Sequence, residues 1–222
     1  MVMDNSYEGL RRRNLQKELD KLLEGLVTEA RVPKLLLHSC CAPCSSYVIE
    51  YLSEYFEITV FYYNPNISQQ EEYEKRVAEQ KRFISQFPAK HPVAFVEGNY
   101  DTGEYYEAVR GLEHCREGGE RCFVCYELRL RAAAQQAVQM GDFDYFTTTL
   151  SISPMKNSAK LNEIGLQLGM EYGILYLASD FKKREGYKRS IQLSHEYHLY
   201  RQNYCGCVFS RRENEARESK SR

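Results

Sequence analysis

The sequence has 222 residues, with 30 Lys and Arg against 31 Asp and Glu and a formal net charge of −1. This length suits one domain with a buried core, and the balanced charge excludes a uniformly basic chain that binds any polyanion. No apolar stretch approaches the length of a transmembrane helix, and the first residues lack the features of a signal peptide. We therefore expect a cytoplasmic protein with no membrane partner.

Three regions are predicted along the chain. The sequence of residues 1–32 predicts an amphipathic helical extension, because its leucines recur at the spacing of one helix face. Pro33 ends this pattern. Residues 33–209 predict a single α/β domain that carries the chemistry. The sequence of residues 210–222 has no apolar side chain larger than that of Ala216, and it predicts a disordered tail.

Short apolar runs alternate with helical patterns through the central region. The runs that predict strands lie at 35–39, 57–67, 91–98, 142–154 and 174–181. The helical patterns lie at 45–56, 69–87, 100–112, 122–140 and 158–173. This alternation predicts parallel βαβ units in a doubly wound, mostly parallel sheet.

Polar loops follow three of the predicted strands. They are HSCCAPC after the first strand, Asn64-Pro65-Asn66 after the second and TTTLSIS at the end of the fourth. Ligands of open parallel sheets bind beyond the carboxyl ends of the strands. We therefore expect these loops to face one crevice.

Eight cysteines fall into four groups: Cys40, Cys41 and Cys44; Cys115; Cys122 and Cys125; Cys205 and Cys207. In a reducing compartment, clustered thiols are more often metal ligands or redox catalysts than structural disulfides. The grouping favours an iron–sulfur centre. A structural zinc site and plain structural thiols are the alternatives.

Two of these groups together offer four thiolates for one cubane cluster. Cys122 and Cys125 precede a long helical run, and a helix N-terminus favours thiolates and anionic clusters. Their spacing does not separate zinc from iron. The adjacent Cys40 and Cys41 can aim at one centre only in a turn, and adjacent cysteines are unusual in zinc fingers.

The other cysteines suggest further roles. Cys44 and Cys115 could hold an additional mononuclear iron, and the loop residue His114 is either a companion ligand or simply solvated. Cys205-Gly206-Cys207 can close into a tight disulfide ring, because glycine relaxes the backbone. Strained disulfides are readily reduced, which suits a two-electron relay, although both thiols could instead be metal ligands.

Six segments together resemble the epoxyqueuosine reductases of the QueH type, over about Leu35 to Arg211: HSCCAPCSSYVIEYL, YYNPNI, HCREGGERCFVCYELRL, TTTLSISPMKN, DFKKREGYKRS and YRQNYCGCVFSR. The resemblance implies an enzyme that performs the last step of queuosine synthesis. It would reduce the epoxide of epoxyqueuosine, at the wobble position of tRNA, to the cyclopentene with loss of water. An electron donor is then a second partner.

The resemblance also implies roles for individual cysteines. Cys40, Cys41, Cys122 and Cys125 would bind a [4Fe-4S] cluster. Cys205 and Cys207 would form the redox-active disulfide. An additional iron beside the cluster would be compatible with the same pattern.

A second resemblance, to the PP-loop or adenine nucleotide alpha hydrolase-like fold of tRNA thiolases, covers the first strand, loop and helix. Cysteines stand where that fold has its phosphate loop, so we expect the fold without ATP use. Two alternative functions follow. One is an iron–sulfur tRNA sulfurtransferase of PP-loop type, and the other is a zinc-stabilised tRNA-binding module without catalysis.

The C-terminal part of the chain is locally basic, with eleven Lys and Arg against five Glu from Phe181 onward. Cations and aromatic rings are the groups that bind RNA phosphates and bases. The candidates for tRNA contact are Lys182, Lys183, Tyr187 and Arg189. A charged amphipathic helix with its tyrosines packed inward is the alternative.

Overall fold

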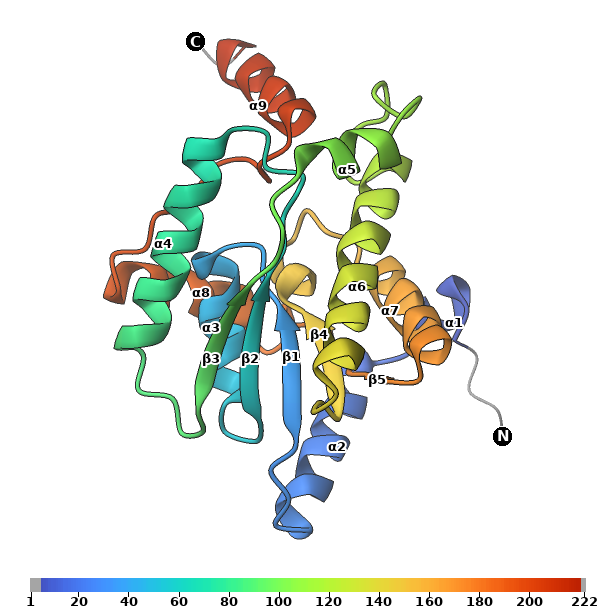
Figure 1. The fold of residues 1–222 in the computed structure, drawn as a ribbon, viewed down its shortest axis with the longest axis vertical. Helices are drawn as coiled ribbons and strands as arrows, with labels where there is room; N and C mark the ends of the chain where they lie inside the picture. The colour runs from blue at the N-terminus through green and yellow to red at the C-terminus, as the bar shows by residue number, and fades with distance from the viewer. Residues whose placement is uncertain (1–4, 221–222) are drawn as a thin grey trace.

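Five parallel strands form the central sheet of the computed structural model, which describes residues 5–220 (Figure 1). They are β1 (Lys34–His38), β2 (Glu57–Tyr62), β3 (Val93–Glu97), β4 (Tyr145–Thr148) and β5 (Leu175–Tyr176). Their order in the sheet is β3-β2-β1-β4-β5. The predicted doubly wound α/β fold is confirmed.

Helices cover both faces of this sheet (Figure 1). One face packs against α2 (Leu15–Thr28), α3 (Ala42–Leu52) and α4 (Gln70–Gln86), and α8 (Gly186–Glu196) packs against α3. The other face packs against α6 (Glu120–Met140) and α7 (Ser158–Tyr172). In β1, the alternate residues Leu35 and Leu37 join the first core and Leu36 joins the second. The three central residues of this strand are therefore all apolar, as expected for a strand that is buried on both faces.

The order of the strands creates a switch point between β1 and β4. From β1 the chain adds β2 and β3 on one side, whereas β4 and β5 follow on the other. The crossover helices α3 and α4 consequently lie on one face, and α6 and α7 on the opposite face. The loops that leave β1 and β4 diverge at this point, which is where ligands of such sheets bind.

The strand expected at 142–154 is shorter in the structure. β4 ends at Thr148, and a 3-10 helix, η1 (Thr149–Ile152), follows it. The Thr148 hydroxyl accepts a hydrogen bond from the Leu150 amide at 3.2 Å. This local bond turns the chain out of the strand.

The N-terminal region forms two helices rather than one. α1 (Tyr7–Arg12) is followed by α2, whose N-cap residue is Asn14. The Asn14 side chain accepts a hydrogen bond from the Lys17 amide at 3.2 Å, and this cap starts a new helix. Leu19, Leu23 and Leu26 of α2, which recur at the spacing of one helix face, pack into the core of the α3 face.

The segment expected to be a disordered tail is helical as far as the structure describes it. α9 (Val208–Lys220) projects from the domain in Figure 1. Ion pairs one helical turn apart support it, such as Arg211 with Glu215 at 3.7 Å. Its first turn is anchored where Phe209 lies against the Arg121 guanidinium, 4.5 Å from the ring centroid.

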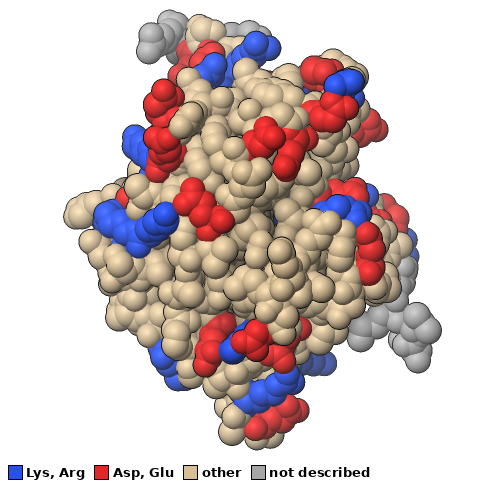
Figure 2. All heavy atoms as spheres, in the orientation of Figure 1, with Lys and Arg blue, Asp and Glu red and all other residues tan. Residues whose placement is uncertain are grey.

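Between α4 and α6 the chain passes through β3 and the short helix α5 (Thr102–Ala108). Within residues 5–220, none of the helices combines the length and apolar character needed to cross a membrane. On the face drawn in Figure 2, acidic and basic side chains are interspersed. That face therefore carries no broad region in which all the charges are positive or all are negative.

Candidate active site at the switch point of the sheet

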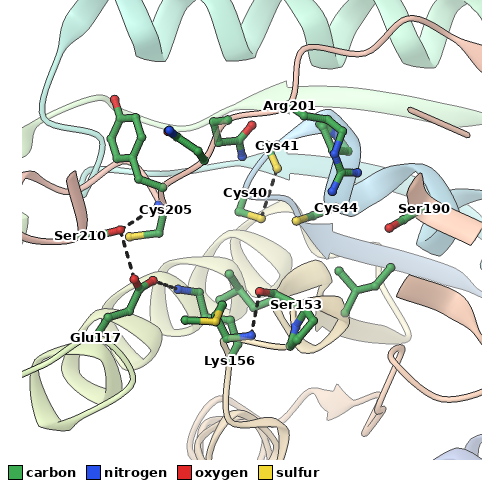
Figure 3. Close-up of a pocket in the computed structure, with 18 of the residues that line it drawn as sticks. Cys40, Cys41, Cys44, Glu117, Ser153, Lys156, Ser190, Arg201, Cys205 and Ser210 are labelled. Carbon is green, nitrogen blue, oxygen red and sulfur yellow. Dashed lines mark hydrogen bonds and ion pairs between the residues drawn. The ribbon is translucent and has the colours of Figure 1, made fainter. Parts of the chain in front are cut away.

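A cavity of about 520 Å³ opens at the switch point, and Figure 3 shows the side chains that line it. Its walls come from the loop after β1, the segment after β4, α8 and the C-terminal segment at 201–217. As expected, the cysteine loop and the Thr/Ser-rich segment face one crevice. The turn after β2 supports them from behind, since the Asn64 amide donates to the Ser39 carbonyl at 2.8 Å.

Three thiols meet in one wall of this cavity. The sulfur atoms of Cys40, Cys41 and Cys44 all lie within 4.8 Å of one another, and those of Cys40 and Cys41 are 3.8 Å apart. Two thiolates on one tetrahedral metal, with bonds of about 2.3 Å, are also separated by about 3.8 Å. This group could therefore hold a metal ion.

The local backbone explains how adjacent cysteines reach the same place. Cys41 is the N-cap of α3 and has extended backbone angles, and Pro43 lies in the first turn of the helix. Proline is favoured there, because the first helical amides have no partner within the helix. The change from strand to helix turns both thiols toward the cavity. The helix N-terminus favours negative charge on them.

Hydrogen bonding distributes charge unevenly within this thiol group. Hydrogen bonds from Cys41 and Cys44 hold the pKa of Cys40 well below its ordinary value. The same interactions raise the pKa of Cys44. Without a metal, one thiolate on Cys40 would be shared by two thiols. This is the donor set that soft metal ions prefer.

Two buried arginines lie beside the thiols. Arg129 is 4 % exposed, and its guanidinium donates to Asn64 Oδ1 and to the Cys125 carbonyl, both at 3.3 Å. Arg76 is 2 % exposed and donates to the Cys205 carbonyl at 3.2 Å. Buried cations need compensation by nearby negative charge. Glu72 already pairs with Arg76 at 2.6 Å, whereas Arg129 has no carboxylate partner among residues 5–220, so it is Arg129 that suits an anionic centre.

Cys122 and Cys125 lie in the first two turns of α6, and both are buried. The Gly118 amide donates to the Cys122 sulfur at 3.2 Å. Burial raises the pKa of each of these thiols. Cys122 belongs to the core on the α6 face, and Cys40 packs against that core. The sulfurs of the pair lie outside the close group formed by Cys40, Cys41 and Cys44.

Cys205 and Cys207 form a second redox-competent group across the cavity. Both thiols are free, and their sulfurs are 3.5 Å apart. Gly206 between them has φ of +113°, and a Cβ there would lie 2.7 Å from Ile67 Cγ1. Only glycine meets both conditions without strain. The hydrogen bond from Cys207 holds the pKa of Cys205 well below its ordinary value.

A chain of polar contacts leads from Cys205 to Lys156 (Figure 3). The Cys205 amide donates to Ser210 Oγ at 3.1 Å, and the Ser210 hydroxyl donates to Glu117 Oε2 at 3.3 Å. The other oxygen of Glu117 accepts from Lys156 Nζ at 3.2 Å. This chain fixes the ammonium group in the wall of the cavity.

Lys156 carries its charge in a buried place. Its side chain is 8 % exposed. Burial alone would lower the pKa of Lys156, but nearby negative groups, Cys205 above all and also Glu117, raise it above its ordinary value. The cavity therefore contains an ammonium group at neutral pH.

Three charged residues of the site, Arg76, Arg129 and Lys156, were not predicted from the sequence. For Arg129 a signal exists, because it follows Cys125 by four residues and so lies on the same face of α6. Arg76 and Lys156 carry no local signal of this kind. Their contacts in the site, with the Cys205 carbonyl and with Glu117, join residues far apart in sequence, and the local ion pair of Arg76 with Glu72 does not indicate the cavity.

His38 acts as a hydrogen-bonding group beneath the site. Its Nδ1 accepts from the Thr148 hydroxyl at 2.8 Å, and its Nε2 donates to the Tyr63 carbonyl at 3.1 Å. Burial lowers the pKa of His38 to about 3. The neutral ring thus joins the ends of β1, β2 and β4 beneath the site.

Cys115 lies apart from the thiols of the cavity. It lines another hollow together with His114 and Arg121, and its sulfur is 3.9 Å from His114 Nε2. Arg217 of α9 borders both hollows. Cys44, in contrast, lies with Cys40 and Cys41.

The candidate tRNA-binding side chains differ in what they contact. Lys182 pairs with Asp180 at 3.0 Å, and Arg189 pairs with Glu50 at 2.6 Å. Lys183 is exposed and has no side-chain partner among residues 5–220. Tyr187 is 38 % exposed and lines the cavity. Lys183 and Tyr187 are therefore the two that are available to a ligand.

Comparison with known proteins identifies relatives of this chain. Residues 35–213 match the family model of epoxyqueuosine reductase QueH. The chain is 45 % identical over 199 residues to the epoxyqueuosine reductase QueH of Streptococcus pyogenes serotype M1, covering 89 % of this chain and 78 % of that protein. It is 42 % identical over 201 residues to that of Staphylococcus aureus, covering 89 % and 83 %. The corresponding protein of Thermotoga maritima is 37 % identical over 197 residues, covering 85 % and 97 %.

Proposed function

The chain belongs to the QueH family of epoxyqueuosine reductases, and we propose that it reduces epoxyqueuosine in tRNA with a [4Fe-4S] cluster and the Cys205–Cys207 dithiol. The observation that carries this proposal is the cavity at the switch point. It has Cys40, Cys41 and Cys44 in one wall and Cys205 in another. The relatives are named for the reductase, so the sulfurtransferase and zinc-module alternatives are not favoured.

The dithiol balances the chemistry of the reaction. Conversion of an epoxide to an alkene breaks two C–O bonds, forms a C=C bond and releases the oxygen as water. It therefore requires two electrons and two protons. Oxidation of the Cys205 thiolate and the Cys207 thiol to one disulfide releases two electrons and one proton, and the Lys156 ammonium can supply the second proton. An electron donor must then reduce the disulfide before the next turnover.

We assign Cys40, Cys41, Cys122 and Cys125 as the cluster ligands. The fit rests on the donors, which are soft sulfurs near the N-termini of α3 and α6, half-buried at Cys40 and buried at the other three residues. Arg129 hydrogen-bonds the backbone of Cys125 and would offset the negative charge of a cluster. When bound, a cluster would transfer electrons one at a time.

Cys44 and Cys115 differ as candidates for an additional iron. Cys44 belongs to the close thiol group, which supports it as a donor. Cys115 lines a different hollow. An additional iron beside Cys44 would supply Lewis acidity toward an oxygen atom.

Lys156 is the protein group best placed to act on the leaving oxygen. Its ammonium is buried in the cavity wall and held by Glu117. A cation in such a water-poor site stabilises developing negative charge on oxygen and can donate a proton to it. We propose that Lys156 binds the epoxide oxygen and protonates it as the ring opens.

The tRNA would present its wobble nucleotide to the cavity. Tyr187, in the wall, offers a ring on which a base can stack. We expect the enzyme to work in the cytoplasm, where its substrate is made. The eight free thiols suit a reducing compartment.

The direct test is turnover of a defined substrate. Protein purified without oxygen is incubated with tRNA that carries epoxyqueuosine and with a chemical reductant, and the digested nucleosides are analysed by mass spectrometry. The proposal predicts loss of one oxygen atom and formation of queuosine. Unchanged epoxyqueuosine, with protein that contains iron and labile sulfide, would overturn it.

A further inference from the structure

The cavity at the switch point, lined by the thiols, is called the redox cavity from here on. A second cavity, of about 510 Å³, lies next to it along the same edge of the sheet. The segment after β4 borders both, since Lys156 lines the redox cavity and Asn157 the second one. The segment after β5 also borders both, through Lys183 in the second cavity and Tyr187 in the redox cavity. A single extended ligand can therefore reach both.

Basic side chains without acidic partners face this second cavity. Arg12 and Lys183 are exposed, and neither side chain has a hydrogen bond or ion pair within residues 5–220. Arg11 pairs with the exposed Glu8 at 3.4 Å and lies over the Tyr7 ring, 5.7 Å from its centroid. The carboxylate of the cavity, Asp180, is already paired with Lys182 at 3.0 Å. The surface therefore presents net positive charge to solvent.

The wall that carries the arginines is a packed part of the domain. The backbone amide of Tyr7 donates to Glu163 at 3.1 Å, and Asn157 donates to the Tyr7 hydroxyl at 2.9 Å. Leu10 is buried. These contacts fix α1 against α7, so that Arg11 and Arg12 are held beside the cavity.

We propose that this second cavity binds backbone phosphates of the RNA that flanks the wobble nucleotide, while that nucleotide occupies the redox cavity. The proposal rests on the proposed tRNA substrate. RNA phosphates bind unpaired Lys and Arg with release of counterions. An RNA strand is also the kind of ligand that can enter one cavity with a base and cross the next with its backbone.

The test is a charge reversal at the two unpartnered cations. In Arg12→Glu/Lys183→Glu, we expect the Kd for tRNA carrying epoxyqueuosine to rise about tenfold or more at low salt. The slope of log K against log salt should become shallower by about two, one for each lost phosphate contact. KM should rise in parallel, whereas the rate at saturating tRNA should stay as in the unmodified protein, since neither residue lines the redox cavity.

A matched control exists on α2. Lys17 and Lys21 are also exposed cations whose side chains have no partner within residues 5–220, and neither lines the second cavity. Lys17→Glu/Lys21→Glu makes the same change in net charge and should leave Kd, salt slope and KM close to those of the unmodified protein. The conservative pair Arg12→Lys/Lys183→Arg should retain binding.

Two outcomes separate this proposal from the proposed function. If the unmodified protein reduces the tRNA but Arg12→Glu/Lys183→Glu changes neither Kd, salt slope nor KM, the second cavity does not bind RNA. Equal weakening by the α2 control would overturn the proposal too, because the effect would then be one of net charge. If the unmodified protein binds tRNA without reducing it, the proposed function fails. The Kd values alone then show whether the second cavity binds RNA. Circular dichroism confirms folding of each variant.

Discussion

Lys156 is buried as a cation because its surroundings compensate for the loss of water. Glu117 accepts one of its hydrogen bonds, and Glu117 is itself fixed by Ser210. Removing one member of a buried, charged network leaves the others unpaired, which is more costly than the net contribution of the contact. The network thus joins the backbone of Cys205 to the cation that we assign to the leaving oxygen.

We predict that Lys156→Ala lowers the single-turnover rate of epoxide reduction by about 10²–10⁴-fold, the usual contribution of a positioned acid. Iron content should stay the same, because Lys156 is not among the proposed ligands. Rapid-quench analysis of the nucleosides measures the rate. Lys160→Ala removes a nearby lysine that lies outside the redox cavity and should have little effect. A rate within threefold, about 0.65 kcal/mol by transition-state theory, of that of the unmodified protein would remove Lys156 from the mechanism.

The residues of the site were predicted from the sequence only where their grouping is local. Adjacent cysteines and the C-x-x-C and C-x-C spacings are visible without a structure. The proximity of Cys44 to Cys40 and Cys41 also follows from the sequence, because the three residues lie within about one helical turn of one another. The contact of Arg76 with the Cys205 carbonyl joins residues 129 positions apart, so no local pattern encodes it.

At the scale of elements, α4 holds the segment that leads to the dithiol. Glu79 accepts from the Tyr200 amide at 2.6 Å and from Arg82 Nε at 2.8 Å. Arg82 also donates to the Tyr197 carbonyl at 2.9 Å. These bonds tie the loop between α8 and α9 to α4, and Cys205 lies in this loop.

This tie should depend on pH. The hydrogen bond from Arg82, and then that from the Tyr200 amide, lower the pKa of Glu79 below its ordinary value of 4.5. A carboxyl group with a lower pKa in the folded state stabilises the fold above its ordinary pKa, and this contribution is lost as pH falls through the folded value. We predict that Glu79→Gln destabilises the protein by at most about 1 kcal/mol at neutral pH, and that the difference shrinks below about pH 4.5.

Urea unfolding from pH 3 to 7, roughly the range in which carboxylates titrate, measures this difference. Glu54→Gln, which removes a partner from the exposed ion pair with Lys90, is the control and should have little effect at any pH. A Glu79→Gln difference that does not change with pH would show that the carboxylate contributes no charge-dependent stability.

The sequence predicts a helix or strand well where the periodicity of apolar residues determines it. It predicts poorly where a single capping residue or a contact with a distant residue determines where the element lies. Alternating apolar runs and helical patterns predict five strands and the crossover helices. The break before Leu15 depends on the Asn14 cap, which the leucine pattern on its own does not indicate. The helix at 208–220 depends on ion pairs within it and on the packing of Phe209 against Arg121, so composition suggested disorder instead.

At the scale of the whole molecule, the doubly wound topology places the two thiol pairs proposed as cluster ligands near the N-termini of helices on opposite faces of the sheet, and Cys40 packs against the core that contains Cys122. Cys40 and Cys41 follow β1 at the switch point, and Cys122 and Cys125 begin α6 on the opposite face from α3. A metal centre between them would join the loop after β1 to the helix that leads to β4. Ligands that bind only the folded state add to its stability.

We therefore predict that removal of iron by a chelator under reducing conditions lowers the Tm. Serine variants of the proposed ligands should each reduce bound iron and labile sulfide in protein purified without oxygen: Cys40, Cys41, Cys122 and Cys125. Cys205→Ser and Cys207→Ser should keep both contents near those of the unmodified protein and still abolish turnover, because the dithiol is proposed to carry electrons rather than hold iron.

Cys115→Ser is the matched control, since it removes a thiol that lines a different hollow. It should retain iron, sulfide and the holoprotein Tm. Loss of iron in Cys205→Ser or Cys207→Ser would place these residues among the ligands instead. Stoichiometric zinc without labile sulfide would contradict the iron–sulfur assignment, because the thiols would then form a closed structural site around a metal that has no redox chemistry.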